Sequence, residues 1–203
     1  MPLVRHLVVF ARLPRLGHGK RRLAKDVGPI EALRFQRTTL ATTLRRIGRD
    51  RRWTTSIAVT PDRTSSWPAR YRLHPQGSGD LGGRMTRIAR RLTRGPLVLI
   101  GSDIPGITAA TIARAFHLLG DRDAVFGPAP DGGYWLVGLK RRPRLIVPFT
   151  GVRWSSPWAL SDTVANLKGA TVGFVDALED VDDGSSWRRW RARLQSSSAS
   201  KAV

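Results

Sequence analysis

With 203 residues, of which 41% are hydrophobic, the chain can bury one sizeable core, and we expect a single domain over residues 1–195. The absence of cysteine excludes disulfides, thiolate metal sites and cysteine nucleophiles. No apolar run approaches the roughly 20 residues of a membrane-spanning helix, so we expect no membrane span and a cytoplasmic protein.

A formal net charge of +20, from 30 arginines and 5 lysines against 15 acidic residues, indicates a surface that attracts anions. The arginines are spread along the whole chain, and no zinc-finger, basic-zipper or RNA-recognition pattern accompanies them. This pattern disfavours specific nucleic-acid binding. It suits a phosphorylated small substrate.

The first half of the chain alternates apolar runs with breakers. A Val-rich run at 4–11 predicts a buried strand, and Pro and Gly residues predict a loop over 13–20. Helical spacing of apolar residues predicts a helix from Pro29 to Gly48. Weaker strands are expected at 56–60 and 70–74.

The second half continues this alternation. In chain order we expect a helix at 85–92, a buried strand at 96–100, a helix at 108–119 with Thr108 as N-cap, a strand pair at 124–126 and 134–139, and a strand at 172–175. The alternation predicts an α/β fold with a mostly parallel sheet, helices on both faces and an antiparallel element late in the chain. The Ser-rich segment 196–203 is predicted to be a disordered tail.

The loop after the first strand is the first candidate site. Gly17 and Gly19 allow the backbone to approach an anion closely, and Arg12, Lys20 and Arg22 add positive charge. The spacing is not that of a P-loop. An ordinary exposed basic turn is the alternative.

Two aspartates follow predicted strands in turn-rich segments. Asp103 comes directly after the strand at 96–100, where open α/β sheets present groups to ligands. A carboxylate there suits Mg²⁺ or Mn²⁺ shared with substrate phosphates. Asp131 precedes Gly132 and Gly133. Either aspartate could instead be a simple turn former.

Five motifs together carry a family resemblance: F-A-R-L-P-R-L-G-H-G-K-R-R-L-A, Q-G-S-G-D-L-G-G-R-M, G-S-D-I-P-G-I, D-A-V-F-G-P-A-P-D-G-G-Y-W-L-V-G-L and W-S-S. Over about residues 3 to 183 the chain resembles a bacterial glycosyltransferase-like family of the GT-A, nucleotide-diphospho-sugar transferase superfamily, catalogued as a domain of unknown function. It is more distantly similar to the guanylyltransferases of molybdenum-cofactor and coenzyme F420 biosynthesis.

The resemblance implies a Rossmann-like GT-A fold that binds a nucleotide sugar or a nucleoside triphosphate and a small-molecule acceptor. The implied nucleotide- and phosphate-binding residues are Arg12, Gly17, Gly19, Lys20, Arg22, Asp80 and Arg84. Asp103 is the implied ligand of Mg²⁺ or Mn²⁺, and Asp131 is implied as a second metal ligand or general base. The implied substrate pocket comprises Gly132, Gly133, Tyr134, Trp154 and Ser155.

The chain departs from the family pattern at several positions. Gly83 stands where the family usually has Glu, which removes a carboxylate, and Gly101-Ser102-Asp103 offers one acid rather than a D-x-D triplet.

We expect glycosyl transfer from a nucleotide-diphosphate sugar. Nucleotidyl transfer to a phosphorylated small molecule is the alternative, and a catalytically inactive nucleotide- or RNA-binding protein is a third hypothesis.

A last acidic cluster comprises Asp180, Asp182 and Asp183. Acidic residues stabilise the N-terminus of a helix, so we expect the cluster to start the final helix rather than to bind a cation.

Overall fold

The computed structural model describes residues 3–63, 67 and 70–199. Its seven-stranded sheet has the order β3-β2-β1-β4-β6-β5-β7. The strands are β1 His6–Arg12, β2 Thr54–Thr60, β3 Arg72–Pro75, β4 Leu97–Gly101, β5 Ala124–Pro128, β6 Tyr134–Leu139 and β7 Val172–Phe174. The helices are α1 Arg21–Val27, α2 Pro29–Ile47, α3 Leu81–Arg91, α4 Ala109–Leu118, α5 Ala159–Ala165 and α6 Gly184–Ala199.

Strand β1 lies near the middle of the sheet and pairs in parallel with β2 and β4. Side chains alternate between the two faces of a strand. Leu7 and Val9 therefore join the core on one face, whereas Val8 joins the core on the other. Burial on both faces explains the continuous apolar run that predicts this strand.

The late antiparallel element is β6, which is antiparallel to both β4 and β5. The loop between β5 and β6 contains Asp131, and the ladder is irregular at Gly127 and Pro128. Strand β7 returns in parallel beside β5. The predicted α/β class, with a mostly parallel sheet and one late antiparallel element, is confirmed.

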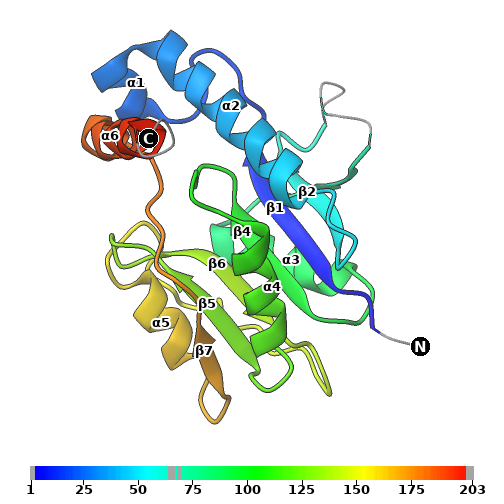
Figure 1. The fold of residues 1–203 in the computed structure, drawn as a ribbon. Helices are drawn as coiled ribbons and strands as arrows, with labels where there is room; N and C mark the ends of the chain where they lie inside the picture. The colour runs from blue at the N-terminus through cyan, green and yellow to red at the C-terminus, as the bar shows by residue number, and fades with distance from the viewer. Residues whose placement is uncertain (1–2, 64–66, 68–69, 200–203) are drawn as a thin grey trace.

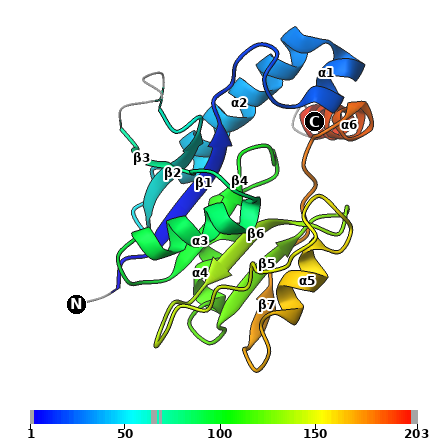
Figure 2. The ribbon, with the colours of Figure 1, turned by 180° about the vertical axis from the view of Figure 1, so that it is seen from behind.

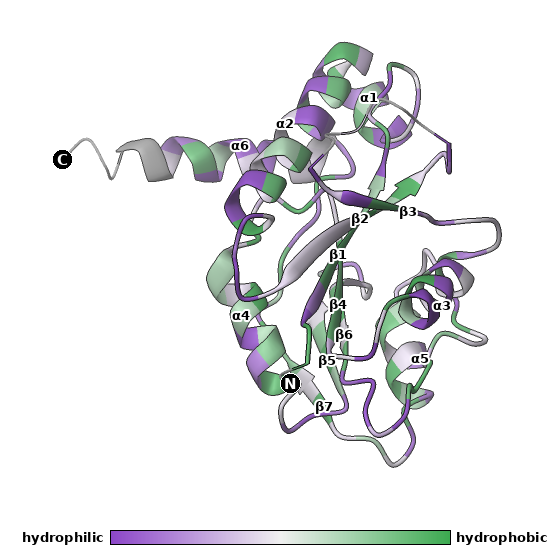
Figure 3. Cartoon of the chain, turned by 90° about the vertical axis from the view of Figure 1, so that its right-hand side faces the viewer, coloured by the Kyte–Doolittle hydropathy of each residue, from purple (hydrophilic) through white to green (hydrophobic). Residues whose placement is uncertain are grey.

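Helices cover both faces of the sheet, as predicted. Figure 3 shows the sheet nearly edge-on, with α2 and α4 on one side and α3 and α5 on the other. The view from behind in Figure 2 shows α3 and α5 on the near face. Helices α2 and α4 contribute Leu44, Ile47 and Phe116 to one core, and α3 contributes Met85 and Ile88 to the other.

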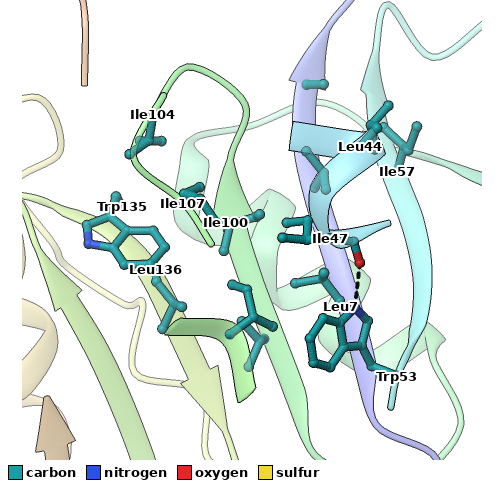
Figure 4. Packing of buried hydrophobic residues seen from close by; sticks show 14 of the residues in the cluster. Leu7, Leu44, Ile47, Trp53, Ile57, Ile100, Ile104, Ile107, Trp135 and Leu136 are labelled. Carbon is teal, nitrogen blue, oxygen red and sulfur yellow. Dashed lines mark hydrogen bonds between the residues drawn. The ribbon is translucent and has the colours of Figure 1, made fainter. Parts of the chain in front are cut away.

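Figure 4 shows side chains of the core under α2 and α4, where Trp53 lies beside Ile47, the last residue of α2. The Trp53 indole N–H donates to the Ile47 carbonyl oxygen over 2.9 Å, and the Trp53 ring stacks on Phe116. A buried indole needs a partner for its N–H group. Trp53 is therefore a core residue.

Two helix boundaries differ from the sequence predictions. Helix α3 begins at Leu81, four residues before the predicted start, because the Asp80 carboxylate accepts from the Gly83 N–H and caps the helix. Helix α6 extends to Ala199, so residues 196–199, predicted as part of a disordered tail, are helical. The rest of that predicted tail, residues 200–203, lies outside the described residues.

The carboxyl ends of β1 and β4 lie together at one edge of the sheet, at the upper end in Figure 1. The segment between β7 and α6 crosses the same edge on its way to α1 and α2 (Figure 1). It is held there by the Leu178 N–H, which donates to the Pro128 carbonyl oxygen, and by the Val181 N–H, which donates to the Asp103 carbonyl oxygen. Three distant parts of the chain therefore meet at this edge.

Candidate active site

The loop after β1 turns back on itself through left-handed backbone. Gly17, Gly19 and Lys20 have φ angles of 76°, 79° and 43°. A Cβ atom at Gly19 would lie 2.8 Å from the Gln36 amide nitrogen and 3.2 Å from the Arg12 side chain, both flexible, so the positive φ rather than space is the main reason for glycine here. The turn directs the Lys20 side chain inward, where only 6% of it is exposed.

Lys20 links two carboxylates at the sheet edge. Its Nζ lies 2.6 Å from Asp103 Oδ2 and 3.2 Å from Asp182 Oδ1. Burial alone would lower the pKa of Lys20, but Asp103 and Asp182 outweigh burial and raise it. Lys20 is therefore a permanently charged ammonium group that holds together the loop, β4 and the segment before α6.

The segment before α6 contributes residues that the sequence motifs do not place at the site. Asp183 accepts from the Ser186 N–H over 2.8 Å and starts α6, as predicted for the cluster. Asp182 instead pairs with Lys20 and also contacts the Arg22 guanidinium. The prediction that all three aspartates serve the helix start is therefore wrong for Asp182, because a side chain 162 positions away is its partner.

A cavity of about 320 Å³ lies beside the loop. We call it the loop cavity; its lining includes Arg12, Gly19, Lys20, Gln36, Asp103 and Asp182. It therefore brings together three of the predicted phosphate-binding residues and the predicted metal ligand. Arg12 itself is exposed, so its guanidinium is accessible to a ligand.

A second cavity, of about 220 Å³, lies on the other side of Asp103. We call it the aromatic cavity; its lining includes Phe10, Met85, Tyr134, Trp135, Trp154 and Asp103. Phe10, Gly101 and Asp103 line both cavities. The carboxylate of Asp103 therefore lies where the two cavities meet.

The loop between β5 and β6 forms one wall of the aromatic cavity. Asp131 lines it and also accepts from the Gly133 N–H over 2.9 Å, so the side chain both forms the turn and faces the cavity. A Cβ atom at Gly132 would collide with the Pro157 carbonyl oxygen, so this position, with its φ of 82°, requires glycine. The Leu160 N–H donates to the Gly132 carbonyl oxygen, which joins this loop to the start of α5.

Aromatic rings make up much of the remaining wall. The Tyr134 ring meets the Trp154 ring edge to face, with centroids 6.3 Å apart. The buried Tyr134 hydroxyl lies 3.4 Å from the Thr163 hydroxyl, and burial raises the pKa of Tyr134, so this phenol stays protonated. The Trp154 indole nitrogen is buried without a hydrogen-bond partner among the described residues, and Ser155 lines the cavity next to it.

Asp180 lies in the aromatic cavity, although no motif in the sequence points to it. Burial raises the pKa of its carboxyl group to about 6. Lys20 opposes this shift, whereas the carboxylates of Asp103, Asp182 and Asp131 add to it. The sheet edge is thus rich in carboxylates, although the chain as a whole is strongly basic.

Several predicted site residues line neither cavity. Asp80 caps α3, and Arg84 donates to the Gly79 carbonyl oxygen over 3.0 Å. Gly17 is in the loop but lines a separate cavity of about 140 Å³, and Arg22 has 77% of its side chain exposed. Gly83 lies on the exposed surface of α3 beside Arg87. Because Gly83 lines neither cavity, glycine at this position removes no carboxylate from either cavity lining.

Oxygen donors at this edge suit a hard divalent cation. No group of three or more His, Cys, Asp or Glu side chains is arranged to hold a metal in the described part of the chain. Asp103 can supply one carboxylate, and Mg²⁺ usually takes its remaining ligands from water and substrate phosphates. The residues therefore fit a metal that binds with a nucleotide better than one that binds to the protein alone.

Comparison with known proteins supports the resemblance seen in the sequence. Residues 43–156 match the model of a family described as "Uncharacterized protein conserved in bacteria (DUF2064)". A solved structure from Desulfovibrio desulfuricans G20, provisionally described as a nucleotide-diphospho-sugar transferase, is similar with a TM-score of 0.80. It is 27% identical in sequence, and the match covers 88% of this chain and 82% of that one.

More distant structures share the fold. The 4-diphosphocytidyl-2C-methyl-D-erythritol synthase of Anaerococcus prevotii DSM 20548 is 10% identical over 95% of this chain and 99% of its own, with a TM-score of 0.61. The manganese complex of Rv0371c from Mycobacterium tuberculosis H37Rv is 15% identical over 93% and 98%, with a TM-score of 0.52. No curated protein sequence matches the chain. None of the helices in the described residues has the length and apolar composition to cross a membrane.

Proposed function

This chain belongs to the bacterial family DUF2064, whose model matches residues 43–156, and we propose that it is a nucleotide-dependent transferase that moves a sugar from a nucleotide-diphosphate sugar to a small acceptor. The observation that carries the proposal is the meeting of two chemically different cavities at Asp103. A group-transfer enzyme needs two adjoining subsites, because donor and acceptor must be held in reacting geometry.

The loop cavity would bind the nucleotide diphosphate. Arg12 and Lys20 supply positive charge, and the glycine at position 19 lets the backbone approach closely. Charge-assisted hydrogen bonds from such groups favour phosphate oxygens. In glycosyl transfer the diphosphate leaves, so cationic groups around it stabilise the charge that develops in the transition state.

The aromatic cavity would hold the acceptor and its attacking hydroxyl, next to the sugar at Asp103. Asp131 lines this cavity and is the candidate general base for that hydroxyl. Mg²⁺ or Mn²⁺ held by Asp103 and the diphosphate would supply additional charge neutralisation when bound. The similar structure from D. desulfuricans supports nucleotide-sugar chemistry, since at 27% identity it is a closer relative than the other structures described above.

Nucleotidyl transfer is the second candidate. In that reaction a phosphorylated acceptor attacks the α-phosphorus of a nucleoside triphosphate, and pyrophosphate leaves. The observation in its favour is the loop cavity, whose Arg12 and Lys20 suit a triphosphate as well as a diphosphate.

A thermal-shift panel tests the proposal. Nucleoside triphosphates, diphosphates and nucleotide sugars are added with and without Mn²⁺ or Mg²⁺ to the wild type, to Asp103→Asn and to Asp121→Asn. A ligand specific for the folded state stabilises by about 2.7 kcal/mol at a hundred times its Kd. We expect a metal-dependent shift with one nucleotide sugar, lost in Asp103→Asn and kept in Asp121→Asn, which removes the same charge from an exposed turn.

Product analysis then separates the alternatives. Release of a nucleoside diphosphate supports glycosyl transfer, whereas pyrophosphate release from a triphosphate supports the second candidate. No shift with any nucleotide would overturn both and favour an RNA-binding protein, for which affinity should fall steeply with salt and be indifferent to Asp103.

A further inference from the structure

The aromatic cavity has a charge opposite to that of the protein. Although the chain has 35 lysines and arginines, no lysine, arginine or histidine among the described residues lines this cavity. Its charged lining residues are Asp103, Asp131 and Asp180, all carboxylates. We propose that the acceptor bound in the aromatic cavity is a hydroxyl compound with a ring and no negative charge, and that phosphorylated acceptors are excluded.

The exclusion follows from the position of the nearest cation. Lys20 lines the loop cavity rather than the aromatic cavity, and its ammonium is already paired with Asp103 and Asp182. A phosphate in the aromatic cavity would lose its hydration and meet carboxylates without a cationic side chain as partner, and a metal ion at Asp103 would already be shared with the nucleotide diphosphate. Like charges placed together at a binding site cost affinity and suppress wrong partners.

The three acids of the cavity offer carboxyl oxygens to a ligand. Burial, with a smaller effect of the neighbouring carboxylates, raises the pKa of Asp180 to about 6 in spite of Lys20. Asp131 accepts a hydrogen bond from the Gly133 N–H. An acceptor hydroxyl could donate to either carboxylate, whereas a phosphate dianion has no proton to donate.

Shape and surface define the rest of the acceptor. The side chains of Phe10, Met85, Tyr134, Trp135 and Trp154 give the cavity mainly apolar walls. Its volume of about 220 Å³ is below the roughly 300–1,000 Å³ typical of sites for drug-sized ligands. A single ring that presents an apolar face to the aromatic side chains and hydroxyls to the carboxylates matches these walls.

That the ligand is an acceptor rests on the proposed function, whereas the selectivity of this cavity for neutral ligands does not. The selectivity also bears on the choice between the two reactions. Nucleotidyl transfer to a sugar phosphate would place an anion among these three carboxylates. The cavity therefore favours glycosyl transfer to a neutral alcohol.

Matched ligand pairs test the inference without knowledge of the donor. The probes are methyl β-D-glucoside, methyl β-D-galactoside and methyl β-D-mannoside, each with a single ring and each with its 6-phosphate, and binding is measured by ligand-observed NMR on the full chain. We expect at least one neutral glycoside to bind, and to bind at least tenfold more tightly than its 6-phosphate.

Leu81 offers a matched pair of variants at the cavity wall. It lines the cavity, is 43% exposed and is the first residue of α3, so a longer polar side chain can be accommodated there. Leu81→Arg adds a cation beside the cavity, whereas Leu81→Gln adds polarity alone. We expect Leu81→Arg to reduce the preference for the neutral glycoside at least threefold and Leu81→Gln to leave it unchanged.

Two outcomes overturn the inference: tighter binding of any 6-phosphate than of its neutral partner by the wild type, or no binding of any neutral probe. An equal effect of both Leu81 variants would also overturn it, because charge would not then decide selectivity. Failure of the nucleotide thermal-shift panel, with neutral selectivity intact, would instead overturn only the proposed function.

Discussion

The two cavities that meet at Asp103 are built in different ways. The loop cavity draws most of its lining from residues 10–20 and from the turn after β4. The aromatic cavity collects side chains from β1, α3, β4, β6, the loop between β5 and β6, the segment before α5 and the segment before α6. The cavity built largely from two strand ends and their loops carries cations, whereas the cavity built from many segments is apolar and acidic.

The two cavities therefore depend on different kinds of interaction: the loop cavity on local backbone turns, and the aromatic cavity on contacts between residues distant in sequence. The loop cavity depends on backbone turns at Gly17, Gly19 and Lys20, which the local sequence largely determines. The aromatic cavity depends on contacts such as those of Gly132 with Pro157 and of the Asp180 segment with the turn after β4. Substitutions should therefore affect the two cavities separately, except at the residues that connect them.

Lys20→Met should have the largest effect, because Lys20 is the cation that connects the parts of the site. Removal of one partner from a largely buried ion pair costs about 3–5 kcal/mol, and the part-exposed Asp103 and Asp182 reduce this to about 2 kcal/mol. We expect a matching loss of stability in urea denaturation. Calorimetry should show nucleotide affinity reduced about a hundredfold, equivalent to about 2.7 kcal/mol.

Lys25→Met is the control for Lys20→Met, since Lys25 is exposed in the last turn of α1. It should leave stability and nucleotide affinity within experimental error of the wild type. Equal effects of the two variants would mean that general positive charge, and not the bridge at Asp103, attracts the nucleotide.

Gly132→Ala should damage the aromatic cavity alone. A methyl group at this position would contact the Pro157 backbone, and the residue would keep an unfavourable positive φ. Strain of this kind costs about 1–3 kcal/mol. We expect weaker binding of neutral glycosides by NMR and unchanged binding of nucleotides by calorimetry.

Gly151→Ala is the control for Gly132→Ala, because it carries the penalty of a positive φ without a steric clash. Gly151 has a φ of 66°, and no atom lies within 4 Å of the position that an added methyl group would take, so only the φ penalty applies. Glycoside binding should persist in this variant. If nucleotide affinity fell together with glycoside affinity in Gly132→Ala, the two cavities would not be independent.

Asp180→Asn should stabilise the protein at neutral pH. Because the pKa of Asp180 is about 6 in the folded state and 3.8 in a free side chain, the folded protein binds the proton more tightly. The associated stability is complete below pH 3.8 and is lost as the pH rises through 6. After allowance for solvent screening, we expect Asp180→Asn to be more stable than the wild type by about 1–2 kcal/mol at pH 7.

Urea denaturation of both proteins at pH 4, 5, 6 and 7 measures this difference. The advantage of Asp180→Asn should grow between pH 4 and pH 7. Asp121→Asn, which removes the same charge outside both cavities, should show no such growth. A pH-independent difference for Asp180→Asn would mean that the carboxyl group is not perturbed in the folded protein.

Gly83→Glu should have the smallest effect, and a favourable one. Gly83 is three residues after the N-cap Asp80, where Glu completes a capping box, and glycine in a helix is unfavourable. We expect stabilisation of about 1 kcal/mol in urea denaturation, with Gly83→Ala giving part of it. Nucleotide and glycoside affinities should not change, since Gly83 lines neither cavity; a change specific to Glu would show that a carboxylate at this position reaches the site.

The sequence by itself determines the elements whose signal is local. Apolar runs locate β1 and β4, Thr108 is recognisable as the N-cap of α4, and Asp103 falls in the turn after a buried strand. Each of these features depends on neighbouring residues, through side-chain periodicity, capping or turn formation. The same local reasoning predicts that Arg12, Gly19 and Lys20, which end β1 or lie in the loop after it, face a ligand, and all three line the loop cavity.

Only the tertiary structure decides which acidic side chains reach the site. Asp80, predicted to bind nucleotide, caps α3 because the Gly83 N–H lies within its reach. Asp180 and Asp182, predicted to start a helix, line the two cavities instead. Their positions follow from the path of the segment before α6 across the ends of β4 and β5, and hydrogen bonds between residues distant in sequence, which no local pattern records, fix that path.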